Sequence, residues 1–201
     1  MKMFSDVDYS FPLFNAPVDH AVIEGAGDCT ECAKYVDILF SGHCYECFRA
    51  GGVDTVMGTE FGMVTLEEAT MGRTHGIPLS NPSELSDYQL TAHPTDPNFP
   101  DEQWFHVHFD KDDLHELLCT PKYSTWQGES WLFCCRKPMV FRGSIPGSLL
   151  EYGAEAFEES IHKFLQKPIW ESTMAGDQSS HTVYAFTCEY CGKLRFHEDS
   201  D

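Results

Sequence analysis

Cysteine spacing is the strongest chemical signal in the sequence. Six of the nine cysteines form three pairs with two residues between the partners: Cys29/Cys32, Cys44/Cys47 and Cys188/Cys191. Two thiolates on one tight turn can reach the same ion, and two such turns complete a tetrahedral zinc site. Eleven residues separate the first two pairs, a spacing typical of a zinc ribbon. The sequence therefore predicts a zinc ion on Cys29, Cys32, Cys44 and Cys47, with a strand and a turn over 34–42 between the pairs.

The third pair is half of a site and requires further ligands. It lies between two strand-like runs, 182–186 and 194–197, and Gly192 follows it directly. A second zinc ion is predicted on Cys134, Cys135, Cys188 and Cys191. Adjacent strand residues point to opposite faces, so Cys134 and Cys135 can share an ion only if a turn or bulge lies there. Cys119 or a histidine is the alternative fourth ligand.

Two catalytic alternatives compete with structural zinc. Thioredoxin-like chemistry needs a cysteine pair at a helix N-terminus, and none of the three pairs is expected to open a helix. His106 and His108 alternate with apolar residues over 104–109 and would project from one strand face as ligands of an open hydrolytic zinc site. A half-buried strand that carries two histidines is the simpler interpretation. We therefore expect no enzymatic activity, and His43 is expected to hydrogen-bond near Cys44 or to sit in the turn.

Several helices are predicted around these sites. Residues 65–68 form a capping box, so a short helix is expected up to residue 71. Asp110 is expected to cap a helix that extends to residue 118. The clearest helix covers 149–167, with an apolar stripe on one face and glutamates on the other.

We predict a single domain of the α+β class over residues 1–201. Small antiparallel zinc-ribbon-like hairpins are expected to pack with one long helix and several short helices. The parts are a first zinc module (26–50), a long insertion-like region (72–112), a second zinc module (126–143 plus 182–197) and the acidic amphipathic helix (149–167). Residues 72–103 hold five prolines and many polar residues, so a long loop is expected there. The N-terminal aromatics, Phe4, Phe11 and Phe14, are expected to pin residues 1–25 onto the body.

The net charge narrows the partner class. Thirteen basic residues against 32 acidic ones give −19, and the excess is spread along the chain. Phosphate contacts need Lys and Arg, so direct binding to nucleic acid or to an anionic membrane is disfavoured. A basic protein is the favoured partner, although net charge can also serve solubility alone. No stretch approaches the ~20 apolar residues of a membrane helix, and acids occupy the N-terminus, so we expect a cytoplasmic location.

Candidate partner-binding residues follow from the charge. They are Asp110, Asp112, Asp113, Glu151, Glu155, Glu158 and Glu159, with Trp126 as an aromatic anchor. The alternative is that these carboxylates form a solvated face, and that the tryptophans at 126 and 131 pack over the second zinc module.

Three segments together resemble the CbrC-like family, bacterial proteins linked to colicin tolerance. They are Phe11-Pro12-Leu13-Phe14, the block from Thr120-Pro121 to Trp126-Gln127-Gly128-Glu129-Ser130-Trp131, and the terminal hairpin around Cys188 and Cys191. The likeness covers about 11–64 and 117–201, and 72–112 looks like an insertion or a diverged stretch. Met139 stands where the family tends to have a further cysteine, so either Cys134 or Cys119 substitutes for it or the second site is incomplete.

The resemblance implies a cytoplasmic, metal-stabilised protein that protects cells against an antibacterial toxin, and it implies no catalytic residues. Together with the charge, it favours an acidic immunity protein that covers the basic substrate cleft of a toxin, most readily a nuclease. The alternatives are a zinc-ribbon adaptor that binds proteins of transcription or RNA processing and, less favoured, a zinc hydrolase.

Overall fold

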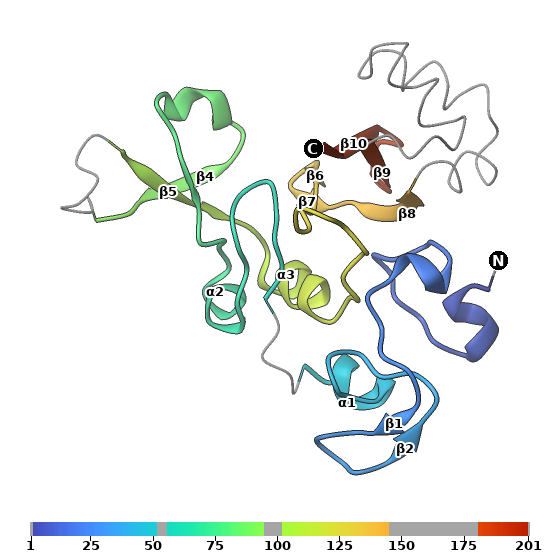
Figure 1. Ribbon diagram of the computed structural model, residues 1–201. Coiled ribbons are helices and arrows are strands. Elements are labelled where there is room, and N and C mark those ends of the chain that lie inside the picture. Colours follow the sequence, from blue (N-terminus) through green and yellow to red (C-terminus); the bar gives the residue numbers. More distant parts are fainter. Residues whose placement is uncertain (1, 52–55, 95–101, 145–180, 201) are drawn as a thin grey trace.

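The computed structural model describes residues 2–51, 56–94, 102–144 and 181–200. Within them, small antiparallel sheets and three short α-helices surround an aromatic core (Figure 1). This confirms the predicted α+β class with small antiparallel sheets and few helices. The long helix predicted over 149–167 lies outside the described residues.

The sheet with the longest strands lies in the second half of the chain. Its order is β10 (Leu194–Ser200), β9 (His181–Thr187) and β8 (Val140–Ser144). The β9–β10 hairpin confirms the two strands predicted over 182–186 and 194–197, and the third cysteine pair lies in its turn. This hairpin therefore presents Cys188 and Cys191 at one end of the sheet.

A second three-stranded sheet corrects one prediction. Central β5 (Trp104–His108) lies between β3 (Ile77–Pro78) and β4 (Gln89–Ala92), and the 3-10 helix η3 (Pro82–Leu85) precedes β4. The expectation of a long loop over 72–103 was therefore wrong for these segments. Strands β3 and β4 have only two and four residues, too few for clear alternation. Pro78 is tolerated because an edge strand can lack one N–H donor.

Two short hairpins carry other cysteines. One pairs β1 (Gly27–Asp28) with β2 (Tyr35–Val36), and the other pairs β6 (Phe133–Cys134) with β7 (Lys137–Pro138). In Figure 1 the first hairpin lies with α1 (Tyr45–Arg49) at one end of the molecule, and the second lies beside the β8–β9–β10 sheet. The two hairpins thus place cysteines at two separate locations.

The two predicted short helices are present with their predicted caps. Helix α2 (Leu66–Met71) begins after Thr65, whose hydroxyl accepts from the Glu68 N–H, and Gly72 ends it in the left-handed conformation. Helix α3 (Lys111–Leu118) begins after Asp110, whose side chain accepts from the Asp112 N–H. The apolar face of α3 buries Leu114, Leu117 and Leu118.

Aromatic side chains dominate the core. Five are fully buried with neighbouring ring centroids between 4.8 and 6.3 Å apart: Tyr123, Trp131, Phe141, Tyr184 and Phe186. The indole N–H of Trp131 donates to the Met139 carbonyl at 2.8 Å, so its one polar group is satisfied.

The N-terminal aromatics pack onto this core, as predicted. Phe4 contacts Phe11 and Phe14 at ring distances of 5.0 and 5.5 Å, and Phe14 contacts Phe141 at 5.0 Å. Ring packing therefore joins the residues before β1 to the sheet, and the Asn15 N–H also donates a hydrogen bond to the Phe141 carbonyl.

A buried carboxylate organises the turn that carries Trp126. Asp199 is 1% exposed, and its Oδ2 accepts from the N–H groups of Trp126 and Gln127 at 2.8 and 3.3 Å and from the Tyr184 hydroxyl at 3.0 Å. The Thr125 hydroxyl also donates to it. Burial opposes ionisation, but these donors lower the pKa of Asp199. Trp126, 66% exposed, thus projects from a fixed turn.

Replacing Asp199 with Asn should destabilise the protein by about 1–3 kcal/mol, since four donors lose a charged acceptor in a buried site. Urea unfolding followed by tryptophan fluorescence measures this, with the exposed Asp37→Asn as the matched control. Equal unfolding midpoints for the two variants would show that the carboxylate does not hold the turn.

Candidate metal centres

The first cluster gathers the four cysteines of the first two pairs. The sulfurs of Cys29, Cys32, Cys44 and Cys47 all lie within 4.8 Å of one another. Cys29 and Cys44 are buried and Cys32 is exposed. Cys29, Cys44 and Leu39 form a small hydrophobic cluster that is separate from the main core.

One prediction about this site was wrong. Cys44 is the N-cap of α1 and Cys47 lies in its first turn, so the second pair does open a helix. The helix is only five residues long, which is why its apolar pattern is not recognisable in the sequence. The four gathered sulfurs nevertheless favour metal binding over a thioredoxin-like redox pair, because redox chemistry uses one pair and not two.

Hydrogen bonds join the two turns of the first cluster. The Thr30 hydroxyl lies 3.1 Å from both the Gly42 carbonyl and His43 Nε2, and His43 Nδ1 lies 2.7 Å from the Ser41 carbonyl. His43 therefore links the two turns through Thr30. This agrees with the expectation that His43 forms a hydrogen bond near Cys44.

The second cluster is formed by Cys134, Cys135, Cys188 and Cys191, whose sulfurs also lie within 4.8 Å of one another. Cys188 is buried, and Cys135 and Cys191 are exposed. Cys188 and Cys134 belong to or pack against the main core. This cluster is therefore part of the main body, unlike the first.

A strained turn allows adjacent cysteines to share this cluster. The two residues between β6 and β7 are Cys135 and Arg136, with φ of +54° and +61°. Positive φ at both positions is the geometry of a two-residue type I′ hairpin, which favours Asn and Gly. A left-handed L-residue costs roughly 1–2 kcal/mol. Cys135 and Arg136 in this turn therefore lower the stability of the fold.

The Cys29–Cys32 turn of the first cluster and the Cys188–Cys191 turn of the second have the same backbone geometry. In both, the N–H of the first cysteine donates to the carbonyl five residues on, at 2.9 Å (Cys29 to Lys34, Cys188 to Lys193). Ala33 and Gly192 occupy the same left-handed position, with φ of +56° and +70°. The two sites thus use one kind of turn, which Gly favours and which Ala adopts with strain.

The sulfur spacing fits tetrahedral zinc. A Zn–S distance of about 2.3 Å places neighbouring sulfurs of a tetrahedron about 3.8 Å apart. The Cys32–Cys44 sulfurs are 3.7 Å apart, Cys134–Cys135 3.9 Å and Cys134–Cys191 3.6 Å. Both clusters could therefore hold a metal ion with all four positions filled by thiolates, in agreement with zinc.

Within each cluster, the pKa is lowered for one thiol and raised for others. Burial opposes ionisation of Cys29, but the N–H groups of Cys32 and Cys44 lower its pKa to about 6. The N–H of Lys193 and neighbouring thiols lower the pKa of Cys191 to about 7. Burial and the nearby sulfurs raise the pKa of Cys134 to about 12. One thiol ionises easily and its neighbours resist, so complete deprotonation requires a cation.

Two other candidate ligands are placed elsewhere. Cys119 is buried with its sulfur 3.7 Å from His115 Nδ1 and takes no part in the second cluster. Met139 is fully buried in the main core. Of Cys134 and Cys119, the structure therefore brings Cys134 to the second cluster.

His106 and His108 do not form a metal-binding group in the described part of the chain. His106 Nδ1 lies 3.0 Å from the Thr74 carbonyl, and His108 Nε2 lies 2.8 Å from the Thr91 hydroxyl. His106 stacks instead on His93, with ring centroids 3.6 Å apart. The half-buried strand is the arrangement observed.

The predicted partner-binding residues are dispersed. Asp110 and Asp112 are exposed at the start of α3, while Asp113 pairs with Lys137 at 2.6 Å. Trp126 is exposed and Trp131 is buried. The glutamates at 151, 155, 158 and 159 lie outside the described residues.

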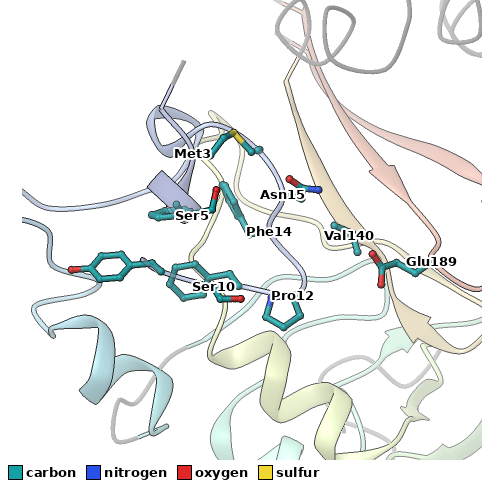
Figure 2. Close-up of a pocket in the computed structure, with 12 residues that line it drawn as sticks. Met3, Ser5, Ser10, Pro12, Phe14, Asn15, Val140 and Glu189 are labelled. Carbon is teal, nitrogen blue, oxygen red and sulfur yellow. The ribbon is translucent and has the colours of Figure 1, made fainter. Parts of the chain in front are cut away.

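A cavity of about 200 Å³ lies between the N-terminal segment and the turn of the second cluster. Figure 2 shows Met3, Phe14 and Val140 beside it, with Asn15 and Glu189 at its polar side. Glu189 is exposed and lies 3.9 Å from Arg142. The described residues that line this cavity include no histidine and no cysteine.

Replacing single ligands should separate the two sites. Zinc-loaded wild type is expected to bind two ions per chain, and Cys29→Ser and Cys188→Ser one each, measured by elemental analysis. Cys188→Ser should lose the larger share of global stability because its cluster belongs to the main core. Cys119→Ser is the control and should keep both ions; a loss of metal there would contradict the assigned ligands.

The stacked histidines predict acid sensitivity. Burial, and secondarily the charge of His93, lowers the pKa of His106 from its ordinary value of 6.5. The unfolded state then binds more protons than the native state, so stability should fall as the pH drops below about 6.5. NMR titration of the His106 ring tests this. His93→Phe keeps a stacked ring and should raise the pKa of His106; an unchanged value would contradict the coupling.

Within the described residues, no helix is long and apolar enough to span a membrane.

Comparisons with known proteins agree with part of this description. The model of the uncharacterised protein family UPF0167 matches residues 79–200, which include the second cluster and exclude the first. The UPF0167 protein PA1536 of Pseudomonas aeruginosa is 30% identical over 93 residues, or 43% of this chain and 52% of that protein. The chain thus spans about half the length of this relative, and no solved structure matches. Since the family model covers more than half of the chain, the protein belongs to the uncharacterised family UPF0167.

Proposed function

We propose that the protein is a cytoplasmic, zinc-stabilised immunity protein that binds a basic antibacterial toxin and acts without catalysis. The observation that carries the proposal is the pair of four-cysteine clusters with tetrahedral sulfur spacing. Four protein ligands close the coordination sphere of zinc, whereas catalytic zinc keeps a position for water or substrate. Metal at these sites would therefore stabilise a surface for binding.

The first cluster supplies a suitable surface. Its turns carry exposed carboxylates, namely Glu24, Asp28, Glu31, Asp37 and Glu46. Lys34 lies 3.2 Å from Glu46 and neutralises one of them. Tyr35, 67% exposed, stands among these acids. An exposed aromatic ring within a charged rim is typical of interface anchors.

The total charge supports a basic partner. A protein at −19 attracts a cationic surface over roughly 10 Å at moderate salt. Acidic side chains on a metal-fixed scaffold could occupy the substrate cleft of a nuclease, where phosphate would otherwise bind. Trp126, held by Asp199, offers a second aromatic contact. The resemblance to the CbrC-like family is the reason for choosing a toxin as the basic partner.

Association kinetics with a cytosolic nuclease toxin encoded beside the gene provide the test. A one-to-one complex is expected, with an on-rate that falls at least about tenfold between low and high salt. The variant Asp28→Asn/Glu31→Gln/Asp37→Asn should bind more slowly, and the matched variant Asp6→Asn/Asp8→Asn/Asp19→Asn should bind like wild type. Metal content is measured for both.

A salt-independent on-rate, or equal slowing by both triple variants, would contradict binding through the first cluster. If the protein also fails to protect cells that express the toxin, the immunity proposal is wrong. Co-purification with polymerase or ribosomal proteins would then favour the adaptor function.

A further inference from the structure

Arg136 is an unusual residue for its position. It is the second residue of the β6–β7 turn, with φ of +61°, where Gly or Asn would be free of strain. Cys135 must be in this turn to reach the second cluster, but no metal ligand requires an arginine beside it. The choice of Arg at a strained position therefore calls for a use of its side chain.

The guanidinium group of Arg136 has no hydrogen-bond or ion-pair partner among the described residues. Arg136 is exposed. Three other arginines differ. Arg49 pairs with Glu116 at 2.7 Å and Arg195 with Glu60 at 2.7 Å. Arg142 Nε donates to the Thr187 hydroxyl at 2.6 Å. Of these four arginines, Arg136 alone has no partner among the described residues.

Its side chain lines a cleft of about 390 Å³, at the lower end of the range for small-molecule sites. One wall is the end of the β3–β5–β4 sheet, with Gln89 and His108 directly opposite each other in the register. The Phe109 ring adds an apolar surface. The remaining wall is the start of α3, with Asp110 and Asp113.

The charges in the cleft define the ligand that it fits. Lys137 lies 2.6 Å from Asp113, so these two charges neutralise each other. His108 is turned toward the Thr91 hydroxyl, 2.8 Å away, and contributes a neutral ring. Arg136 and Asp110 remain as the cation and the anion that line the cleft. Asp110 uses Oδ1 to accept from the Asp112 N–H at 2.9 Å, so its Oδ2 is the oxygen left for a ligand. A guanidinium binds carboxylates and phosphates by paired hydrogen bonds, and a carboxylate binds hydroxyl or amino hydrogens.

We propose that this cleft binds a small polar metabolite that presents a carboxylate or phosphate to Arg136 and a hydroxyl or amino group to Asp110. The site goes beyond the proposed immunity function and does not depend on it. Because Arg136 directly follows Cys135, a bound ligand would contact the same turn that carries an exposed residue of the second cluster.

The test uses zinc-loaded full-length protein and NMR titration with three probes. L-Serine carries a carboxylate, glycerol 3-phosphate a phosphate, and glycerol neither, so the first two identify the oxyanion and the third measures non-specific effects. At least one anionic probe should shift the Gln89, His108 and Arg136 signals in a saturable manner, and glycerol should not.

Two matched variants make the result specific. Arg136→Gly relieves the left-handed strain and should unfold at an equal or higher temperature than wild type, yet bind the active probe at least tenfold more weakly. Lys193→Ala removes an exposed cation next to Cys191, outside the cleft, and should bind like wild type.

Three results would overturn the proposal. One is the absence of a saturable shift with either anionic probe. Another is equal affinity in Arg136→Gly and wild type. The third is a lower unfolding temperature of the ligand-free Arg136→Gly protein at unchanged metal content, which would assign the arginine a purely structural role.

Discussion

Four thiols within 4.8 Å of one another cannot all ionise unless a cation lies between them, and this structure meets that constraint twice. Each cluster holds one thiol that ionises readily beside others that resist. A divalent ion removes the conflict and converts its binding energy into folding energy. An ion in each cluster would fix β1, β2 and α1 at the first site, and the β6–β7 and β9–β10 turns at the second.

The two clusters differ in what they support. The first joins turns that pack in a small cluster of their own, and Thr30 and His43 bridge them. The second joins a strained two-residue turn to the β9–β10 hairpin next to the aromatic core. A metal ion at the first site would fix an acidic, aromatic surface, whereas a metal ion at the second would hold β6–β7 against the main sheet. The adjacent cleft with Arg136 thus lies at the structurally more central site.

Exposed and buried carboxylates have different roles in this acidic protein. Asp199, Glu60 and Glu116 are engaged in hydrogen bonds or ion pairs that join distant segments. The carboxylates around Tyr35 are exposed, and in the proposed function they would attract a basic partner over a long range. The same residue types therefore differ in burial: some join distant segments of the fold, and others remain open to solvent.

The sequence by itself determined the residue types and spacings that are local. Cysteines two residues apart must share a turn, Thr65 with Glu68 must cap a helix, and alternation over 104–108 must form a strand, because each signal lies within one or two turns of chain. Only the tertiary structure decided which distant elements meet. It brought Cys134 rather than Cys119 to the second cluster. The turn after Cys134 has Cys135 and Arg136 in the left-handed conformation, which no local preference predicts. The tertiary structure also placed Cys44 at a five-residue helix, paired the short strands β3 and β4 with β5, stacked His106 on His93 and put Arg136 in a cleft. These features depend on long-range packing, which outweighs the weak preferences of short segments.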